Sequence, residues 1–101
     1  MICCSFVFKP GQYDDDFHRL DAQIDQYARS LPGFEKVETW YSADGTVVNA
    51  MYFFTDRKAV AQLARFPVHR EAKAQVHRWY ETYHIVVSEV TATYGDRHPL
   101  S

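Results

Sequence analysis

The fold is decided by residues Phe66 to Glu89, which read FPVHREAKAQVHRWYETYHIVVSE. Pro67 suits the first turn of a helix, because the backbone N–H groups there have no helical partner to lose. The helix is expected to end after the aromatic pair Trp79 and Tyr80. The run Ile85 to Val87 then changes the pattern from helical to extended. A helix followed at once by a strand is therefore predicted here.

Three more strands and two more helical segments are predicted upstream of this stretch. Turn signals at Pro10-Gly11, Pro32-Gly33 and Asp44-Gly45 separate them. The expected segments are strands over 2–8, 34–42, 47–54 and 85–94, a helix following Asp14 to Asp16, a short helix from Asp56 to Leu63 or Ala64, and a tail over 95–101. The order β-α-β-β-α-β, with its second helical region broken in two, is typical of the ferredoxin-like split βαβ arrangement, an α+β class with an antiparallel sheet.

Size and charge narrow the function classes. The 101 residues predict a single domain over 1–101. A net charge of −2, with no basic stripe, argues against a nucleic-acid partner. The hydrophobic share of 47% exceeds what one small core can bury, so a homodimer is expected. Apolar residues on both predicted sheet faces favour sheet-to-sheet packing of two subunits: Phe6, Phe8, Trp40, Tyr52, Phe54 and Val86.

The cysteines and the N-terminus predict a cytoplasmic protein. Cys3 and Cys4 are neighbours, which fits neither a disulfide framework nor a zinc site, so two reduced thiols are expected. No pair of histidines has metal-ligand spacing, and no metal is predicted. The N-terminus lacks the basic region of a signal peptide, and no apolar run approaches the length of a membrane span. A soluble protein without a membrane partner is expected.

Two sequence motifs resemble those of a known family. Residues 67–73 give P-x-H-x-x-A-K, followed by Trp79-Tyr80, and Leu31 to Phe34 read L-P-G-F. Together with the element order they resemble the antibiotic biosynthesis monooxygenase (ABM) domain of the dimeric α/β-barrel superfamily, from about Leu31 to Gly95. The resemblance implies a homodimeric barrel. The superfamily includes oxygenases, haem degraders, isomerases and members without an assigned activity.

The resemblance also distinguishes two chemistries. Cofactor-free oxygenases of the family have a D-G-T…V-V-N pattern, which Asp44 to Asn49 match, but their Trp falls on Phe53 or Phe54 here and their Tyr on Ala59 or Val60. Haem-degrading relatives have an axial His where this chain has Lys73. The resemblance therefore implies no haem, and it favours oxygenation without flavin, haem or metal.

Asn49 and His69 are the predicted catalytic residues. Asn is depleted in strands, and a buried amide needs partners, so Asn49 either binds a substrate oxygen or makes a cross-strand or loop hydrogen bond. His69 lies in the first turn of the last helix, where the helix dipole disfavours its cation. It is either a proton acceptor or an ordinary exposed or loop-capping imidazole.

Aromatic side chains are predicted to line the substrate pocket: Trp40, Tyr52, Phe53 and Trp79. Aromatic residues at helical spacing more often belong to the core, and this alternative stays open for Trp79. The predicted function is a cofactor-independent, monooxygenase-like protein that acts on a small aromatic or phenolic substrate with O2. The alternative is a non-catalytic ligand-binding or stress-response module on the same scaffold.

Overall fold

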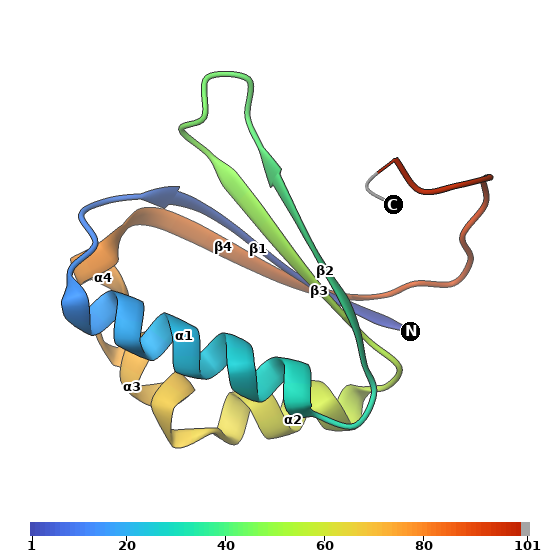
Figure 1. Ribbon diagram of the computed structural model, residues 1–101, viewed down its shortest axis with the longest axis horizontal. Helices are drawn as coiled ribbons and strands as arrows, with labels where there is room; N and C mark the ends of the chain where they lie inside the picture. The colour runs from blue at the N-terminus through green and yellow to red at the C-terminus, as the bar shows by residue number, and fades with distance from the viewer. Residues whose placement is uncertain (100–101) are drawn as a thin grey trace.

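A four-stranded antiparallel sheet with helices on one face forms the computed structural model, which describes residues 1–99 (Figure 1). The elements are β1 (Ile2–Pro10), α1 (Asp15–Ser30), β2 (Phe34–Tyr41), β3 (Val48–Phe54), α2 (Arg57–Arg65), α3 (Pro67–Ala74), α4 (Val76–Trp79) and β4 (Tyr80–Glu89). This confirms the predicted ferredoxin-like α+β class. The second helical region consists of three helices instead of the two that were predicted.

The strand order is β2-β3-β1-β4, so β2 and β4 form the two edges. All neighbouring strands are antiparallel, and β1 pairs with both β3 and β4. Side chains alternate between the two faces along each strand. The register therefore tells which residues share a face, and this decides where a site can lie.

Helix α1 begins and ends at the signals present in the sequence. The Asp14 side chain caps it by accepting a hydrogen bond from the Phe17 N–H at 2.9 Å. After the helix, Gly33 adopts a φ of 93°, which is in the left-handed region that favours glycine. A Cβ at this position would lie 2.5 Å from the Thr55 hydroxyl oxygen. The turn into β2 therefore requires glycine for both its conformation and its space.

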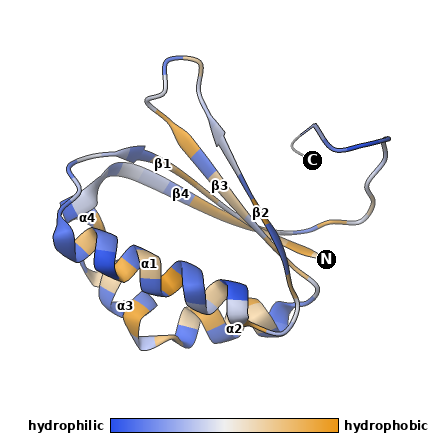
Figure 2. Ribbon diagram, viewed as in Figure 1, coloured by the Kyte–Doolittle hydropathy of each residue, from blue (hydrophilic) through white to orange (hydrophobic). Residues whose placement is uncertain are grey.

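Two buried clusters fill the space between the helices and the sheet. The first joins α1, α2 and β3 around Phe54, which is fully buried. The second joins α1 and α4 through Phe17, Leu20 and Trp79, with Val68 and Ala72 of α3 packed against it. Apolar and hydrophilic residues alternate along α1 and α2, as expected for helices that cover a core on one side (Figure 2).

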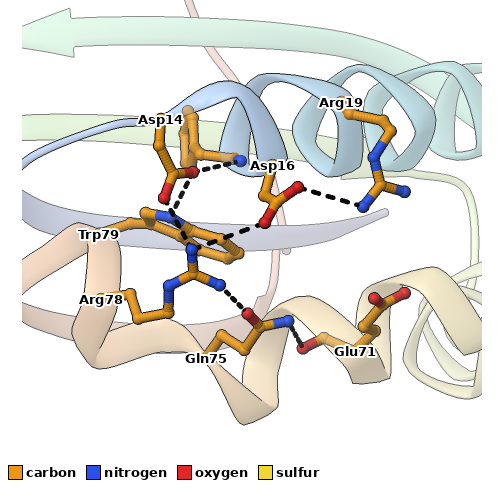
Figure 3. Close-up of polar contacts among 8 residues, drawn as sticks. Asp14, Asp16, Arg19, Glu71, Gln75, Arg78 and Trp79 are labelled. Carbon is orange, nitrogen blue, oxygen red and sulfur yellow. Dashed lines mark hydrogen bonds and ion pairs between the residues drawn. The ribbon is translucent and has the colours of Figure 1, made fainter.

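The Asp14 carboxylate connects the start of α1 to the end of α4 (Figure 3). Its Oδ1 accepts from the Trp79 indole N–H at 3.0 Å, and its Oδ2 lies 2.7 Å from Arg78. The hydrogen bond from the Phe17 backbone, with those from Trp79 and Arg78, lowers the pKa of Asp14. Arg78 also contacts Gln75 and lies near Asp16. The contacts of Asp14 with Trp79 and Arg78 therefore connect α1 to α4 and hold the Trp79 side chain in the core.

The segment that predicted the fold differs from expectation in two places. The helix breaks at Gln75, whose φ and ψ of −117° and 16° end α3 before α4 begins. The last strand begins at Tyr80 instead of Ile85 and ends at Glu89 instead of Tyr94. It starts early because Tyr80 still pairs with Pro10 beyond a bulge. It stops early because β1 begins at Ile2, the partner of Glu89.

Apolar residues lie on both faces of the sheet, as predicted, but four of the six that the prediction named face the helices. Phe6, Phe8, Tyr52 and Phe54 face the helices, because they alternate with residues that point away. Trp40 and Val86 lie on the other face, which we call the open face. The open face mixes apolar and polar side chains: Lys36, Glu38, Trp40, Asn49, Met51, Phe53, Cys3, Ser5, Val7, Thr82, His84, Val86 and Ser88.

The chain after β4 has no regular structure as far as residue 99. The Val90 N–H donates to the Met1 carbonyl at 2.8 Å. Further on, His98 Nε2 lies 2.8 Å from Glu38 Oε1 on β2. This segment includes most of the predicted tail over 95–101, and residues 100 and 101 lie outside the part of the chain that is described.

Candidate functional site

Asn49 lies on the open face at the hairpin end of β3, with its amide oriented by a neighbour. The Ser5 hydroxyl of β1 donates to Asn49 Oδ1 at 2.7 Å. The amide oxygen is thereby occupied, while the amide NH2 group makes no hydrogen bond within residues 1–99. Because an amide presents two N–H donors on this nitrogen, Asn49 can offer them to a ligand on the open face.

The β2-β3 hairpin sets the position of Asn49 relative to Trp40. Asp44 Oδ1 accepts hydrogen bonds from the Ser42 hydroxyl, the Thr46 hydroxyl and the Thr46 N–H, at 2.7, 2.8 and 3.1 Å. These bonds lower the pKa of Asp44 to about 2. The tight turn fixes the register in which Trp40 and Asn49 are directly paired. The indole of Trp40 and the amide of Asn49 therefore lie side by side on one face.

Aromatic and charged residues continue this face away from the hairpin. Phe53 lies four residues after Asn49 on the same strand, with the Lys36 ammonium 4.8 Å from its ring centroid. The Trp40 indole donates to Glu38 at 3.4 Å. Hydrogen bonds from Lys36 and Trp40 lower the pKa of Glu38. Three predicted site residues, Asn49, Trp40 and Phe53, thus share the open face.

His69 lies on the opposite side of the sheet, in the helix layer. It is half-buried on α3, and its Nδ1 is buried without a hydrogen-bond partner within the described chain. Burial and the nearby Lys73 charge lower its pKa, against an opposing interaction with the Leu63 backbone. The structure does not bring His69 and Asn49 together, because the sheet separates them. A role for each in catalysis stays a prediction.

Tyr52 and Trp79 also lie on the helix side. The Tyr52 hydroxyl donates to Asp25 Oδ1 at 2.7 Å, and burial followed by this bond raises the pKa of the phenol. Trp79 is buried, with only 2% of its surface exposed, and belongs to the core cluster of Phe17 and Leu20. Neither side chain reaches the face that carries Asn49.

Sequence reasoning missed Ser5 and His84 as members of this face. Ser5 is a polar residue inside the otherwise apolar run of β1, which was the available signal. His84 was placed before the last strand, so its face could not be assigned. The strand in fact includes His84 and pairs it with Val7, which is also the partner of Asn49.

An open groove of about 380 Å³ lies between α2 and the end of β4. Val60, Ala61 and Ala64 of α2 form one wall, and Val87 of β4 contributes to the other. Arg57 and Glu89, with N and O atoms 3.7 Å apart, both line this groove. None of the six predicted site residues lines it.

Metal-ligating side chains do not gather anywhere in residues 1–99: no three His, Cys, Asp or Glu residues there could hold one ion. Both cysteines are free thiols, and burial raises the pKa of each. No helix within the described chain is both long and apolar enough to cross a membrane.

Comparison with solved structures identifies the fold. SnoaB, a cofactor-independent oxygenase from Streptomyces nogalater, has a TM-score of 0.73 at 14% identity, covering 94% of this chain and 97% of its own. Rv0793 from Mycobacterium tuberculosis has a TM-score of 0.67 at 19% identity, covering 93% and 98%. A structure of an antibiotic biosynthesis monooxygenase has a TM-score of 0.68 at 9% identity, covering 91% and 100%.

These neighbours confirm the resemblance at the level of fold. The chain has an ABM-like fold. No family model matches the sequence, and no curated protein matches it. Identities below 20% establish the fold alone, so substrate and chemistry must be argued from the residues of this chain.

Proposed function

We propose that the protein is a cofactor-independent monooxygenase that acts on a small aromatic, phenol-like substrate with O2. One observation carries the proposal: the Asn49 amide is oriented by Ser5 and keeps its N–H donors unused beside Trp40. Oriented donors in a dry site stabilise negative charge that develops on a substrate oxygen. The aromatic neighbour offers a flat apolar surface for a ring. The same fold in SnoaB, a cofactor-independent oxygenase, supports this choice.

The chemistry needs no partner other than O2. An electron-rich phenolate transfers electrons to O2, one oxygen atom forms a new C–O bond on the ring, and the other leaves as water. A hydroquinone thus becomes a hydroxylated quinone, and the substrate itself supplies all of the electrons. The protein favours the anion by hydrogen bonding and keeps water away from it. Asn49 donates a hydrogen bond to a ring oxygen of the substrate in this scheme.

A second copy of the chain is the partner that closes the site. In a sheet-to-sheet homodimer, the open face would be covered, and Val86, which is 45% exposed in the single chain, would be buried. Enclosure lowers the local dielectric and strengthens the hydrogen bond to the anion. We place this homodimer in the cytoplasm, as expected from its sequence.

The proposed oxygenase is tested by O2 consumption with metal-free protein on a panel of phenols and hydroquinones. We expect turnover with at least one hydroquinone, and Asn49→Ala should reduce it by about a hundredfold, as the loss of an oriented donor usually does. His77→Gln is the matched control, because His77 is exposed on α4, away from the open face. Absence of O2 consumption across the panel would refute the proposal.

A non-catalytic ligand-binding module is the second candidate. The groove between α2 and β4 favours it, since its apolar walls and adjacent Arg57 suit a small amphipathic molecule. Binding there would be lost in Ala61→Asp or Ala64→Asp, because a charge would enter the apolar wall. The binding module is favoured over the oxygenase if aromatic ligands bind to the wild-type protein without O2 consumption and no longer bind to these variants.

A further inference from the structure

A single row of side chains crosses the open face near the hairpin. The register pairs Trp40 with Asn49, Asn49 with Val7, and Val7 with His84. These residues therefore lie side by side across β2, β3, β1 and β4, all on the open face. Val7 is the one aliphatic member of this four-residue row and lies between the amide and the imidazole, where it can form a floor for a ring.

Resting on the proposed oxygenase function, we propose that His84 is its proton acceptor and binds the substrate oxygen opposite the one held by Asn49. The imidazole nitrogen takes the phenolic proton: the substrate O–H bond breaks, an N–H bond forms, and the electron pair stays on the phenolate oxygen. The step needs no further reactant. Imidazole is suited to it because it exchanges protons near neutral pH.

The spacing of the row determines which substrates fit. Asn49 and His84 are two strands apart, and neighbouring strands lie about 4.8 Å apart, so their backbones are separated by about 10 Å. Because side chains stand roughly perpendicular to a sheet, the amide and the imidazole keep about this separation, and two hydrogen bonds of about 2.8 Å through one shared oxygen would be too short to span it. The ligand must therefore carry two oxygens on opposite sides of its ring, a 1,4 arrangement. Two oxygens on adjacent ring carbons would be too close together.

His84 is available for this role. It is exposed, and it makes no hydrogen bond or ion pair within residues 1–99. On its own strand its open-face neighbours are Thr82 and Val86, and no strand lies beyond β4. Across β1, Lys9 is the charged group on the same face, paired with Thr82. The Lys9 charge favours a substrate anion near His84.

The three histidines on the helix side, His18, His69 and His77, do not lie in the row that contains Asn49. His18 contacts the rings of Tyr13 and Phe17 on the helix side. His69 lies on α3, and His77 lies on α4 near the Tyr83 ring, at 6.2 Å between centroids. Since the sheet separates all three from Asn49, His77→Gln serves as a control for His84→Gln.

4-Nitrophenol is a suitable probe, because its oxygens lie at opposite ends of one ring and its anion is yellow. Titration near neutral pH should show that the wild-type protein increases the anionic fraction of the bound probe. His84→Gln should abolish this increase, and His77→Gln should retain it. 2-Nitrophenol, with neighbouring oxygens, should bind at least tenfold more weakly than 4-nitrophenol. An anionic fraction unchanged in His84→Gln, or equal binding of the two isomers, would overturn the inference.

Turnover separates this inference from the proposed function. With an active hydroquinone, His84→Gln should lower kcat by a hundredfold or more, as general bases often contribute, and flatten the pH profile near neutrality. Unchanged kcat and pH profile in His84→Gln would refute the role of His84 while leaving the oxygenase intact. Loss of the 4-nitrophenol signal in His84→Gln, combined with no O2 consumption by wild type, would keep the phenol site and refute the oxygenase.

Discussion

Trp79 and Trp40 lie on the two sides of the same sheet and differ in how they are held. Trp79 is 2% exposed, packs against Phe17 and Leu20, and donates its indole N–H to the Asp14 carboxylate. Trp40 is 44% exposed and makes one long hydrogen bond to Glu38. The helix side is thus closed by its own chain, whereas the hairpin end of the open face keeps Trp40 accessible; farther along this face, Phe53 and Cys3 are buried.

Residues that stabilise the fold and residues that are available to a ligand therefore lie on opposite sides of the sheet. On the helix side, Tyr52 donates to Asp25 and Trp79 donates to Asp14, and within residues 1–99 only His69 Nδ1 is buried without a partner. On the open face, the Asn49 NH2 group and the His84 imidazole have none within residues 1–99. Groups that are already satisfied contribute to folding, while oriented donors without partners can serve a ligand. Three predictions test this contrast, beginning with the largest expected effect.

Replacing each tryptophan by alanine should give very unequal losses of stability. Trp79→Ala should lower the free energy of unfolding by about 3–5 kcal/mol, because it leaves a large cavity in the core. Trp40→Ala should lower it by less than Trp79→Ala, because Trp40 is 44% exposed in the single chain and lies outside the two core clusters. Urea denaturation followed by circular dichroism measures both. Equal losses would contradict the contrast between the two faces.

Charges introduced at neighbouring positions of β4 should reveal the proposed dimer interface. Val86 and Ile85 are 45% and 47% exposed and point to opposite faces. Val86→Glu should convert the dimer to a monomer, because it would bury unpaired charges between the two sheets. Ile85→Glu, the matched control, should remain dimeric. Light scattering at micromolar concentration measures this, and a monomeric wild-type protein would exclude the sheet-to-sheet dimer.

The Asp14 contacts should make stability depend on pH. Because the folded pKa of Asp14 is lowered, its charged form stabilises the fold above the ordinary aspartate pKa. This contribution is lost as the pH falls through the lowered pKa. Asp14→Asn keeps a good helix cap but carries no charge. Its urea midpoint should therefore lie below that of wild type at neutral pH and approach it in acid. A constant difference at all pH values would contradict the electrostatic account.

The sequence predicted the fold more completely than the site, for physical reasons. Alternation of Val37, Thr39 and Tyr41 with polar residues located β2 correctly, and Asp56 capped α2 as expected. The start of β4 was misplaced because Tyr80 to His84 are mostly polar, and an edge strand tolerates polar residues. Pairing with Lys9 and Pro10 of β1 extends this strand. These residues are far away in the sequence, so the local residue pattern could not predict the pairing.

Which candidate side chains share a face depends on the register of the strands, and the sequence does not determine this register. Asn49, Trp40 and Phe53 were predicted together and do share a face. His69 was selected for its place in a helix, but the helix layer lies behind the sheet. His84 was not assigned to a face, because the last strand was predicted to begin at Ile85, one residue later. A shift of one residue reverses the face of every side chain, so no local signal could assign these residues.

The central claim, that ligands bind on the open face, is tested most directly by the two tryptophan indole N–H signals in a ¹⁵N–¹H NMR titration. The chain has two tryptophans, one on each side of the sheet. Addition of 4-nitrophenol should shift the Trp40 signal, which lies beside Asn49, and leave the Trp79 signal in place. A shift of the Trp79 signal alone, or of neither signal at saturating probe, would contradict the account.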